Sequence, residues 1–179
     1  MKEQHVILVD EHDAELGTMQ KMEAHQKGVL HRAFSIFIFD SKGKMLLQKR
    51  SAEKYHGGNL WTNACCSHPY PGEQIGEAAA RRLKEEMGFI TPLKEIFSFT
   101  YHALVENGLE EHEFDHVFAG LYESEIIPDK GEVADFAFED MNRIRWALEN
   151  QPEKFTSWFR IAFPKIELWW KETFGKMTA

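Results

Sequence analysis

The sequence predicts one mixed α+β domain. Segments whose apolar residues alternate, as in β-strands, are interspersed with segments whose apolar residues recur at helical spacing. The 179 residues are 43% hydrophobic and 28% charged, an ordinary globular composition with enough apolar side chains for one core. The chain has no internal repeat, low-complexity tract or linker, so a single domain is expected over residues 1–179.

Strands dominate the first third of the chain. Residues 33–39 (AFSIFIF) alternate and are rich in aromatic and β-branched side chains, which favours a strand. The polar turn at 40–44 leads into a partner strand at 45–48, so the two are expected to form a hairpin. The other elements expected here are a strand at 5–9, a short helix at 21–26 broken near Gly28, and a polar loop at 51–59.

A charged helix is predicted at residues 74–87, because its apolar side chains recur at helical spacing and Gly88 stands at its C-terminal end. Two ion pairs at i,i+4 are expected on this helix, Glu77–Arg81 and Arg82–Glu86. Beyond it we expect strands at 96–105, 111–122 and 135–138, a turn at 106–108, and helices at 139–149 and 155–174. A proline at position 164 should kink or split the last helix.

The charge and the cysteine content exclude several classes of function. A net charge of −8 at pH 7 disfavours a nucleic-acid-binding surface. No apolar run approaches the ~20 residues that span a bilayer, and the N-terminus does not resemble a signal peptide. The only two cysteines are adjacent, which indicates free thiols in a reducing cytoplasm. We therefore expect a cytoplasmic protein, and a monomer.

The segment 61–69 (WTNACCSHP) gathers reactive residue types in a short stretch. A thiol and an imidazole two positions apart, at Cys66 and His68, precede a helix that carries carboxylates. Reaction centres are often built on such irregular segments held by a scaffold. The alternative is a turn around a buried Trp with two inert thiols, and this segment alone does not decide between them.

The predicted strand at 111–122 places Glu111, Glu113 and Asp115 on one face, because side chains alternate along a strand. An isolated pair of strand carboxylates usually belongs to a solvated face. Here the opposite face carries His112 and His116, so neither face is plainly the core. This favours an acidic face that is directed at a cation.

A set of three histidines and two glutamates could hold a divalent metal ion. His25 and His31 lie six residues apart across the break at Gly28, and single histidines of this kind are more often structural or exposed. Together with His68, Glu111 and Glu113 they offer nitrogen and oxygen ligands without a thiolate. Such a set suits Mn²⁺, Mg²⁺ or Zn²⁺.

Four cations flank the same region, and each could bind phosphate oxygens or lie on the surface as an ordinary charge: Lys21, Arg50, Lys54 and Arg82. The carboxylate of Glu86 could hold a Mg²⁺ ion shared with those phosphates. The alternative for Glu86 is an exposed ion pair with Arg82, which would contribute only ~0.3–0.5 kcal/mol.

These motifs closely resemble those of type 1 isopentenyl-diphosphate Δ-isomerases, a family of the Nudix superfamily. WTNACCSHP is similar to the family's Trp-Thr-Asn-x-x-Cys-x-His-Pro, and Glu111-His112-Glu113 matches its E-x-E. KMEAH, ending at His25, and LHRAF, containing His31, match its first two metal histidines. The resemblance runs from HVILVD to TSW and implies a Nudix-like α/β/α sandwich with a mixed sheet.

The resemblance also implies a reaction and a set of roles. The reaction is a 1,3-proton shift between isopentenyl and dimethylallyl diphosphate, with Cys66 and Glu113 as the acid/base pair on opposite faces of the alkene. Cys66 would act as a thiolate, Tyr101 would hydrogen-bond beside the acidic group, and Trp158 would face a carbocation-like intermediate. Glu86 and the Cys66 carbonyl would hold Mg²⁺ on the substrate. The second metal would be bound by His25, His31, His68, Glu111 and Glu113, and the diphosphate by Lys21, Arg50, Lys54 and Arg82.

Two departures from the usual Nudix hydrolase box bear on the alternatives. Arg82 stands at a position where the hydrolase motif has a metal-binding glutamate, so it weakens the hypothesis of a pyrophosphohydrolase. Ser67 stands at the position of the first glycine of that motif. A non-catalytic diphosphate- or metal-binding module is the hypothesis from another class. Only the isomerase predicts that activity is lost when Cys66 is replaced.

Overall fold

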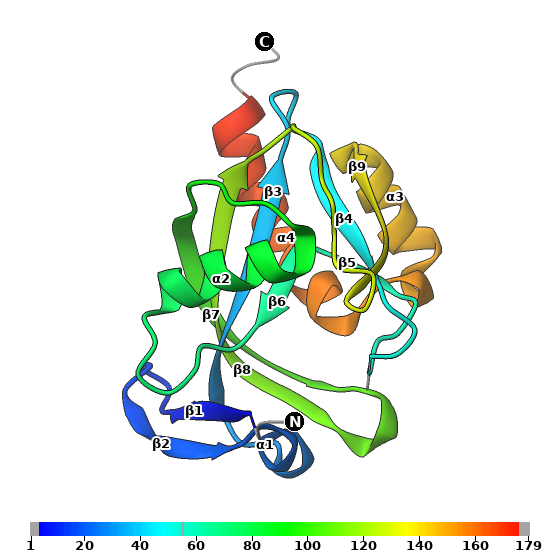
Figure 1. Ribbon diagram of the computed structural model, residues 1–179. Helices are drawn as coiled ribbons and strands as arrows, with labels where there is room; N and C mark the ends of the chain where they lie inside the picture. Colours follow the sequence, from blue (N-terminus) through cyan, green and yellow to red (C-terminus); the bar gives the residue numbers. More distant parts are fainter. Residues whose placement is uncertain (1–3, 55, 176–179) are drawn as a thin grey trace.

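The computed structural model describes residues 4–54 and 56–175, and within them one curled, mixed sheet of nine strands lies between two layers of helices (Figure 1). The strands are β1 (His5–Val9), β2 (Glu15–Gln20), β3 (His31–Phe39), β4 (Met45–Arg50), β5 (Trp61–Thr62), β6 (Cys65–Ser67), β7 (Lys94–Leu104), β8 (Glu110–Leu121) and β9 (Val133–Glu139). The helices are α1 (Lys21–Lys27), α2 (Ile75–Met87), η1 (Glu106–Gly108), α3 (Met141–Asn150), η2 (Pro152–Lys154) and α4 (Ser157–Phe174).

Strand β3 is the centre of the sheet and brings the sequence motifs together. It pairs in parallel with β8, in a register that sets His31 opposite Glu113. It also pairs antiparallel with β6, which sets Ser35 opposite Cys66. Helix α1 lies at the foot of β3 and β8 (Figure 1). The candidate ligands and the candidate thiol therefore meet around one end of β3.

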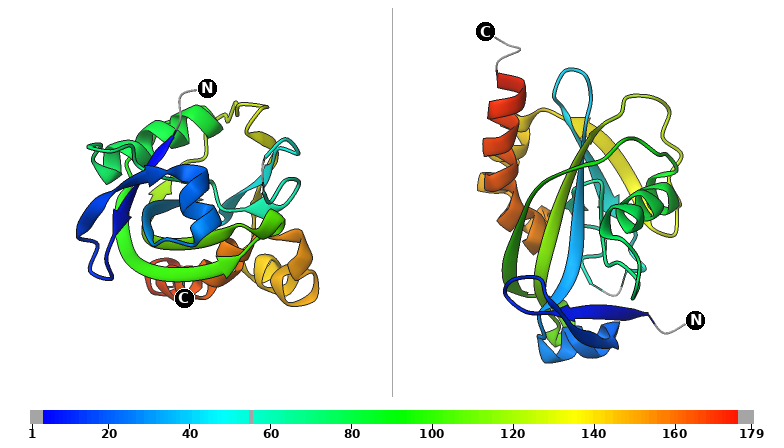
Figure 2. Two further views of the ribbon diagram at one scale, coloured as in Figure 1. Left: turned by 90° about the horizontal axis from the view of Figure 1, so that it is seen from below. Right: turned by 90° about the vertical axis from the view of Figure 1, so that its left-hand side faces the viewer.

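The predicted α/β/α sandwich with a mixed sheet is confirmed. Alternate residues of β3 enter two different cores, because side chains alternate across a strand. Phe34 and Ile36 pack with Leu83 of α2, while Phe37 packs with Phe159 of α4. The right-hand view of Figure 2 shows α2 and α4 on opposite sides of the sheet.

Most predicted helices and strands form. The structure differs from the prediction in the pairing of β3 and β4, in an additional strand, β2, and in the course of α4 at Pro164. The expected hairpin of residues 33–39 and 45–48 pairs at only one position, Phe39 with Met45. The rest of β3 is occupied by β6 and β8, so β4 pairs with β9 instead. Strand β2 was not predicted, since most of its side chains are exposed or only half-buried. Helix α4 runs through Pro164 without being split.

The ion pairs on α2 follow the prediction in one case only. Arg82 pairs with Glu86, as expected. Arg81 does not pair with Glu77 but with Glu73, at 2.7 Å from Nε to Oε1, and with Glu85 at 3.3 Å. Glu73, in the turn before the helix, accepts from two nitrogens of the Arg81 guanidinium, one on each carboxylate oxygen. Such a two-bond pair is stronger than a single contact.

Within the described ranges, no helix is both long and apolar enough to cross a membrane.

Candidate active site

Three imidazole rings meet at the end of the sheet. His25 lies in α1, His31 begins β3, and His68 follows β6. Gly28 ends α1 in a left-handed conformation (φ 60°) and turns the chain back, so that the rings of His25 and His31 lie 4.8 Å apart. The His68 ring lies 5.0 Å from His31 and 5.5 Å from His25.

Backbone carbonyls orient two of these rings. His25 Nδ1 donates to the carbonyl of Lys21 and His31 Nδ1 to that of Val29, both at 2.7 Å. A carbonyl can only accept, so Nδ1 carries a proton in each ring, and the neutral form of either ring would present the lone pair of Nε2 to the cluster. Histidines that bind metals are commonly held by such a second hydrogen bond.

Two buried carboxylates complete the cluster. Glu113 Oε1 lies 3.0 Å from His68 Nε2 and 3.7 Å from His31 Nε2, and Glu111 Oε2 lies 3.3 Å from His25 Nε2. Along β8, Glu111, Glu113 and Asp115 are all buried on the same face, as the alternation predicted. The solvated acidic face, which was the alternative, does not occur.

The ionisation of Glu113 is set by opposing effects. Burial raises its pKa, but the nearby His31 imidazole and a hydrogen bond from Tyr101 outweigh this effect and bring the pKa to about 2. The Tyr101 hydroxyl donates to Glu113 Oε2 at 2.6 Å. Burial and the charge of Glu113 raise the pKa of Tyr101 well above its ordinary value, so its hydroxyl remains a donor.

The cluster fits a divalent metal ion. One ligand atom from each of His25, His31, His68 and Glu113 lies within 4.8 Å of the others. Neighbouring ligands at ~2.1 Å from one ion would be about 3 Å apart, and the Nε2 atoms of His31 and His68 are 3.2 Å apart. Burial lowers the pKa of His68 well below its ordinary value, so this ring is neutral and can offer a lone pair.

Cys66 rather than Cys65 faces the candidate site. Cys65 is buried in the core beneath α2, whereas Cys66 lines a small cavity beside the metal cluster. The Cys66 thiol donates to Asn63 Oδ1 at 3.1 Å and lies 3.5 Å from Ser35 Oγ. Burial and the nearby Asp115 carboxylate raise the pKa of Cys66, so the resting group is a thiol and not the expected thiolate.

The small cavity, about 40 Å³ in volume, joins the candidate acid/base pair to an aromatic ring and two cations. Cys66, Glu113 and Tyr101 line it, together with Trp158. The Trp158 side chain is largely buried, and the guanidinium carbon of Arg50 lies 5.1 Å from its ring centroid. Trp158 is thus both a core residue and a wall of the cavity.

The remaining predicted cations lie beside the cavity. Lys54 and Arg82 both pair with Glu132, and Arg82 also pairs with Glu86. Burial lowers the pKa of Lys54, and the positive charges of Arg50, Arg82 and Lys21 add to this effect. Lys54 is therefore close enough to the other three predicted phosphate-binding cations for their charges to affect it.

Glu86 is not an exposed ion-pair partner. It is buried, and Gln48 Nε2 donates to its second oxygen at 3.1 Å while donating to the Ala64 carbonyl at 2.8 Å. This arrangement holds the carboxylate against the start of β6, next to the Cys65–Cys66 pair.

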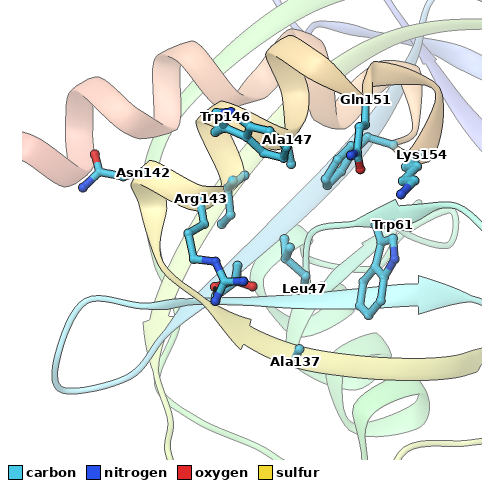
Figure 3. Close-up of a pocket in the computed structure, with 12 residues that line it drawn as sticks. Leu47, Trp61, Ala137, Asn142, Arg143, Trp146, Ala147, Gln151 and Lys154 are labelled. Carbon is cyan, nitrogen blue, oxygen red and sulfur yellow. Dashed lines mark ion pairs between the residues drawn. The ribbon is translucent and has the colours of Figure 1, made fainter.

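A larger cavity of about 590 Å³ lies between β4, β9 and α3, beside η2 (Figure 3). Leu47, Trp61 and Trp146 contribute to its walls. It contains none of the predicted catalytic or metal-binding side chains, and size alone does not make it the reaction site.

Sequence reasoning did not single out several residues of the site. His56, from the loop before β5, has its Nε2 at 2.6 Å from Glu111 Oε1. Asn63 anchors the thiol, and Ser35 donates to the buried Asp115 at 2.8 Å. Only Asn63 carried a signal, because it belongs to WTNACCSHP.

Comparisons with known proteins show which family the chain belongs to. The NUDIX domain family model matches residues 29–159. The chain is 49% identical over 169 residues to "Isopentenyl-diphosphate Delta-isomerase 2" of Photorhabdus laumondii, an alignment covering 92% of this chain and 96% of that protein. It is 46% identical to "Isopentenyl-diphosphate Delta-isomerase" of Pectobacterium atrosepticum, with 93% of both chains covered.

Solved structures support the fold. A crystal structure from Deinococcus radiodurans matches with a TM-score of 0.77 at 16% identity, covering 90% of this chain and 98% of that chain. A MutT protein from Methanosarcina mazei matches with a TM-score of 0.63 at 19% identity, covering 77% of this chain and 93% of that chain. The sequence relatives and the family model show that the chain belongs to the isopentenyl-diphosphate Delta-isomerase family, within the NUDIX superfamily.

Proposed function

We propose that this enzyme interconverts isopentenyl diphosphate and dimethylallyl diphosphate by an allylic proton shift. The observation that carries this proposal is the single cavity lined by the Cys66 thiol, the Glu113 carboxylate and the Trp158 ring. An isolated alkene is a poor base, so the reaction needs a positioned proton donor, a positioned acceptor and little water. The cavity offers all three.

The proton transfers can be assigned to the two side chains. A C–H bond forms at the terminal methylene carbon as one group donates a proton, and the positive charge develops at the tertiary carbon. A C–H bond then breaks at the carbon between the alkene and the CH₂O group, and the other group takes that proton. Cys66 and Glu113 would serve as this donor and acceptor on opposite faces of the alkene, and their roles would reverse with the direction of the reaction.

The charge that develops during the shift needs an electron-rich neighbour. The face of Trp158 can provide it, since a desolvated cation over an indole ring gains about 2 kcal/mol or more. Lys21, Arg50, Lys54 and Arg82 would hold the diphosphate, which fixes the alkene against the acid/base pair.

Divalent metal ions would have two places in this site. His25, His31, His68, Glu111 and Glu113 would bind Mn²⁺, Mg²⁺ or Zn²⁺, and Glu86 with the Cys66 carbonyl would hold Mg²⁺ at the diphosphate. When bound, such ions supply positive charge that lowers the pKa of ligating groups and neutralises phosphate oxygens. We further propose that the protein works as a cytoplasmic monomer with one domain over residues 1–179, whose ends lie outside the described residues.

Proton NMR of the purified protein with isopentenyl diphosphate and Mg²⁺ in heavy water tests the proposal. We expect dimethylallyl signals with incorporated deuterium in the wild type, and a rate at least ~10³-fold lower in Cys66→Ala, because one proton-transfer group is missing. Cys65→Ala is the matched control and should keep its activity. Unchanged alkene signals with release of free phosphate would indicate a pyrophosphohydrolase instead, and no change of either kind would indicate a binding module.

A further inference from the structure

His56 lies at the edge of the metal cluster, and no sequence motif assigned it a role. We propose that His56 is a positioning residue that holds the Glu111 carboxylate in the orientation needed to bind the metal ion. Its effect on turnover rests on the proposed function, whereas its effect on metal binding can be measured without any reaction.

The first observation is that the two carboxylates of the cluster are held in the same way. Glu113 presents Oε1 to the imidazoles and receives the Tyr101 hydroxyl on Oε2 at 2.6 Å. Glu111 presents Oε2 to His25 Nε2 at 3.3 Å, and its Oε1 lies 2.6 Å from His56 Nε2. Each carboxylate thus has one oxygen facing the cluster and one oxygen in close contact with a buried side chain. His56 therefore contacts the outer oxygen of Glu111 as Tyr101 contacts the outer oxygen of Glu113.

The second observation separates this role from direct metal binding. His25, His56 and Glu111 do form a group that could bind an ion. However, the 2.6 Å between His56 Nε2 and Glu111 Oε1 is a direct imidazole–carboxylate contact, and it is shorter than the ~3 Å expected between neighbouring ligands of one ion. The His56 ring also lies 6.3 Å from that of His25, farther than the 4.8 Å between His25 and His31.

The third observation is that the chain around His56 is fixed by groups other than the metal ligands. Arg50 Nη2 donates to the His56 carbonyl at 3.0 Å, and the Gly57 N–H donates to Glu106 at 2.9 Å. Gly57 has φ +60°, and a Cβ there would lie 3.2 Å from both the Arg50 guanidinium and the Trp158 ring. The loop is therefore closely packed against these two side chains.

The His56 ring also contacts the wall of the cavity. It meets the Trp158 ring edge to face, with centroids 5.4 Å apart and an angle of 70° between the planes. His56 therefore connects the Glu111 carboxylate to the aromatic face that the proposed reaction uses. Two substitutions can separate these contacts, because glutamine keeps an N–H donor and phenylalanine keeps a ring.

The test is the affinity of metal-stripped, full-length protein for Mn²⁺, measured by isothermal titration calorimetry in wild type, His56→Phe and His56→Gln. Loss of an outer partner of a metal ligand typically costs 10–100-fold in metal affinity. We expect a loss of this size in His56→Phe, and a smaller one in His56→Gln because its amide can still donate to Glu111.

His102→Gln is the matched control. It removes an imidazole–carboxylate contact of the same length, 2.6 Å from His102 Nε2 to Glu110 Oε2, from a half-exposed pair. Its Mn²⁺ affinity should equal that of the wild type. Circular dichroism of each variant checks that the fold is retained.

A second readout comes from turnover at saturating Mn²⁺ and from the bound ion itself. His56→Phe should lower kcat for isopentenyl diphosphate with little change in KM, and should alter the electron paramagnetic resonance spectrum of bound Mn²⁺. Equal Mn²⁺ affinity in wild type and His56→Phe would overturn the inference. Equal, large losses in both variants, with loss of one imidazole nitrogen coupling, would make His56 a ligand and also overturn it. Normal Mn²⁺ results without isomerisation by the wild type would overturn the proposed function alone.

Discussion

At the scale of single residues, the site depends on which of two buried groups holds a proton. Burial raises the pKa of both Cys66 and Glu113, but only Glu113 has hydrogen-bond donors that reverse the effect. Cys66 instead lies near Asp115, whose charge raises the thiol pKa further. The sequence indicated Cys66 and Glu113 as candidate site residues. It did not indicate which of them holds a proton, because that depends on side chains from other strands.

Tyr101→Phe tests how Glu113 is stabilised. Removing the hydroxyl leaves a buried carboxylate oxygen without its donor, so the free energy of unfolding of the metal-free protein should fall by about 1–3 kcal/mol at pH 7. Because the folded pKa of Glu113 is about 2 and its ordinary value is 4.5, its ionisation stabilises the fold above pH 4.5, and this contribution is lost as the pH falls toward 2. The variant has a higher folded pKa and should lose less stability between about pH 5 and pH 3.

Urea unfolding at several pH values measures both effects of that substitution. Tyr122→Phe is a matched control, since the Tyr122 hydroxyl donates to the neutral carbonyl of Glu125 at 2.9 Å near the surface. It should change the free energy of unfolding by no more than ~0.5 kcal/mol. A Tyr101→Phe protein with wild-type stability and the same pH dependence would contradict this account of Glu113.

At the scale of elements, local patterns predict helices and strands well but not strand partners. The helix at 74–87 was predicted to within a residue, because its apolar face and Gly88 are local signals. The hairpin of 33–39 with 45–48 forms only at its turn, where Phe39 pairs with Met45, because β8 and β6 pair along the rest of β3. Both of these strands come from later in the chain, and nothing near residue 40 reveals them.

Gly88→Ala tests the end of α2, which carries Arg82 and Glu86. Gly88 has φ +79°, and a Cβ there would lie 2.0 Å from the carbonyl oxygen of Ile127. A left-handed conformation alone costs an alanine about 1–2 kcal/mol, and the backbone contact must add to this. We expect the free energy of unfolding to fall by more than about 2 kcal/mol in urea titrations.

The same helix offers the control for that substitution. Gly76 lies in the first turn of α2, and nothing would contact a Cβ placed on it. Gly76→Ala should leave stability unchanged or raise it by up to ~1 kcal/mol, since alanine favours the helix. If the two alanine variants were equally stable, the steric account of Gly88 would be wrong.

At the scale of the whole molecule, the site is assembled from segments that lie far apart in the sequence. Helix α1, the start of β3, the end of β6 and the first half of β8 each supply candidate metal ligands. Spacing alone could not bring these segments together, and in the sequence only the resemblance to a known family indicated that they meet. The resemblance did not indicate His56, because its proposed role depends on a loop that folds back against Glu111 and Trp158.

A metal ion held by these segments should stabilise the whole fold as well as permit turnover. An ion that binds only the folded protein adds about 2.7 kcal/mol to the free energy of unfolding at 100 times its Kd. Exhaustive chelation should therefore abolish isomerisation and lower Tm, and Mn²⁺ or Mg²⁺ should restore both. His68→Ala should lose most of the metal-dependent rise in Tm, whereas His116→Ala, on the opposite face of β8, should keep it. Unchanged turnover and unchanged Tm after chelation would exclude a functional metal at the three-histidine, two-glutamate cluster.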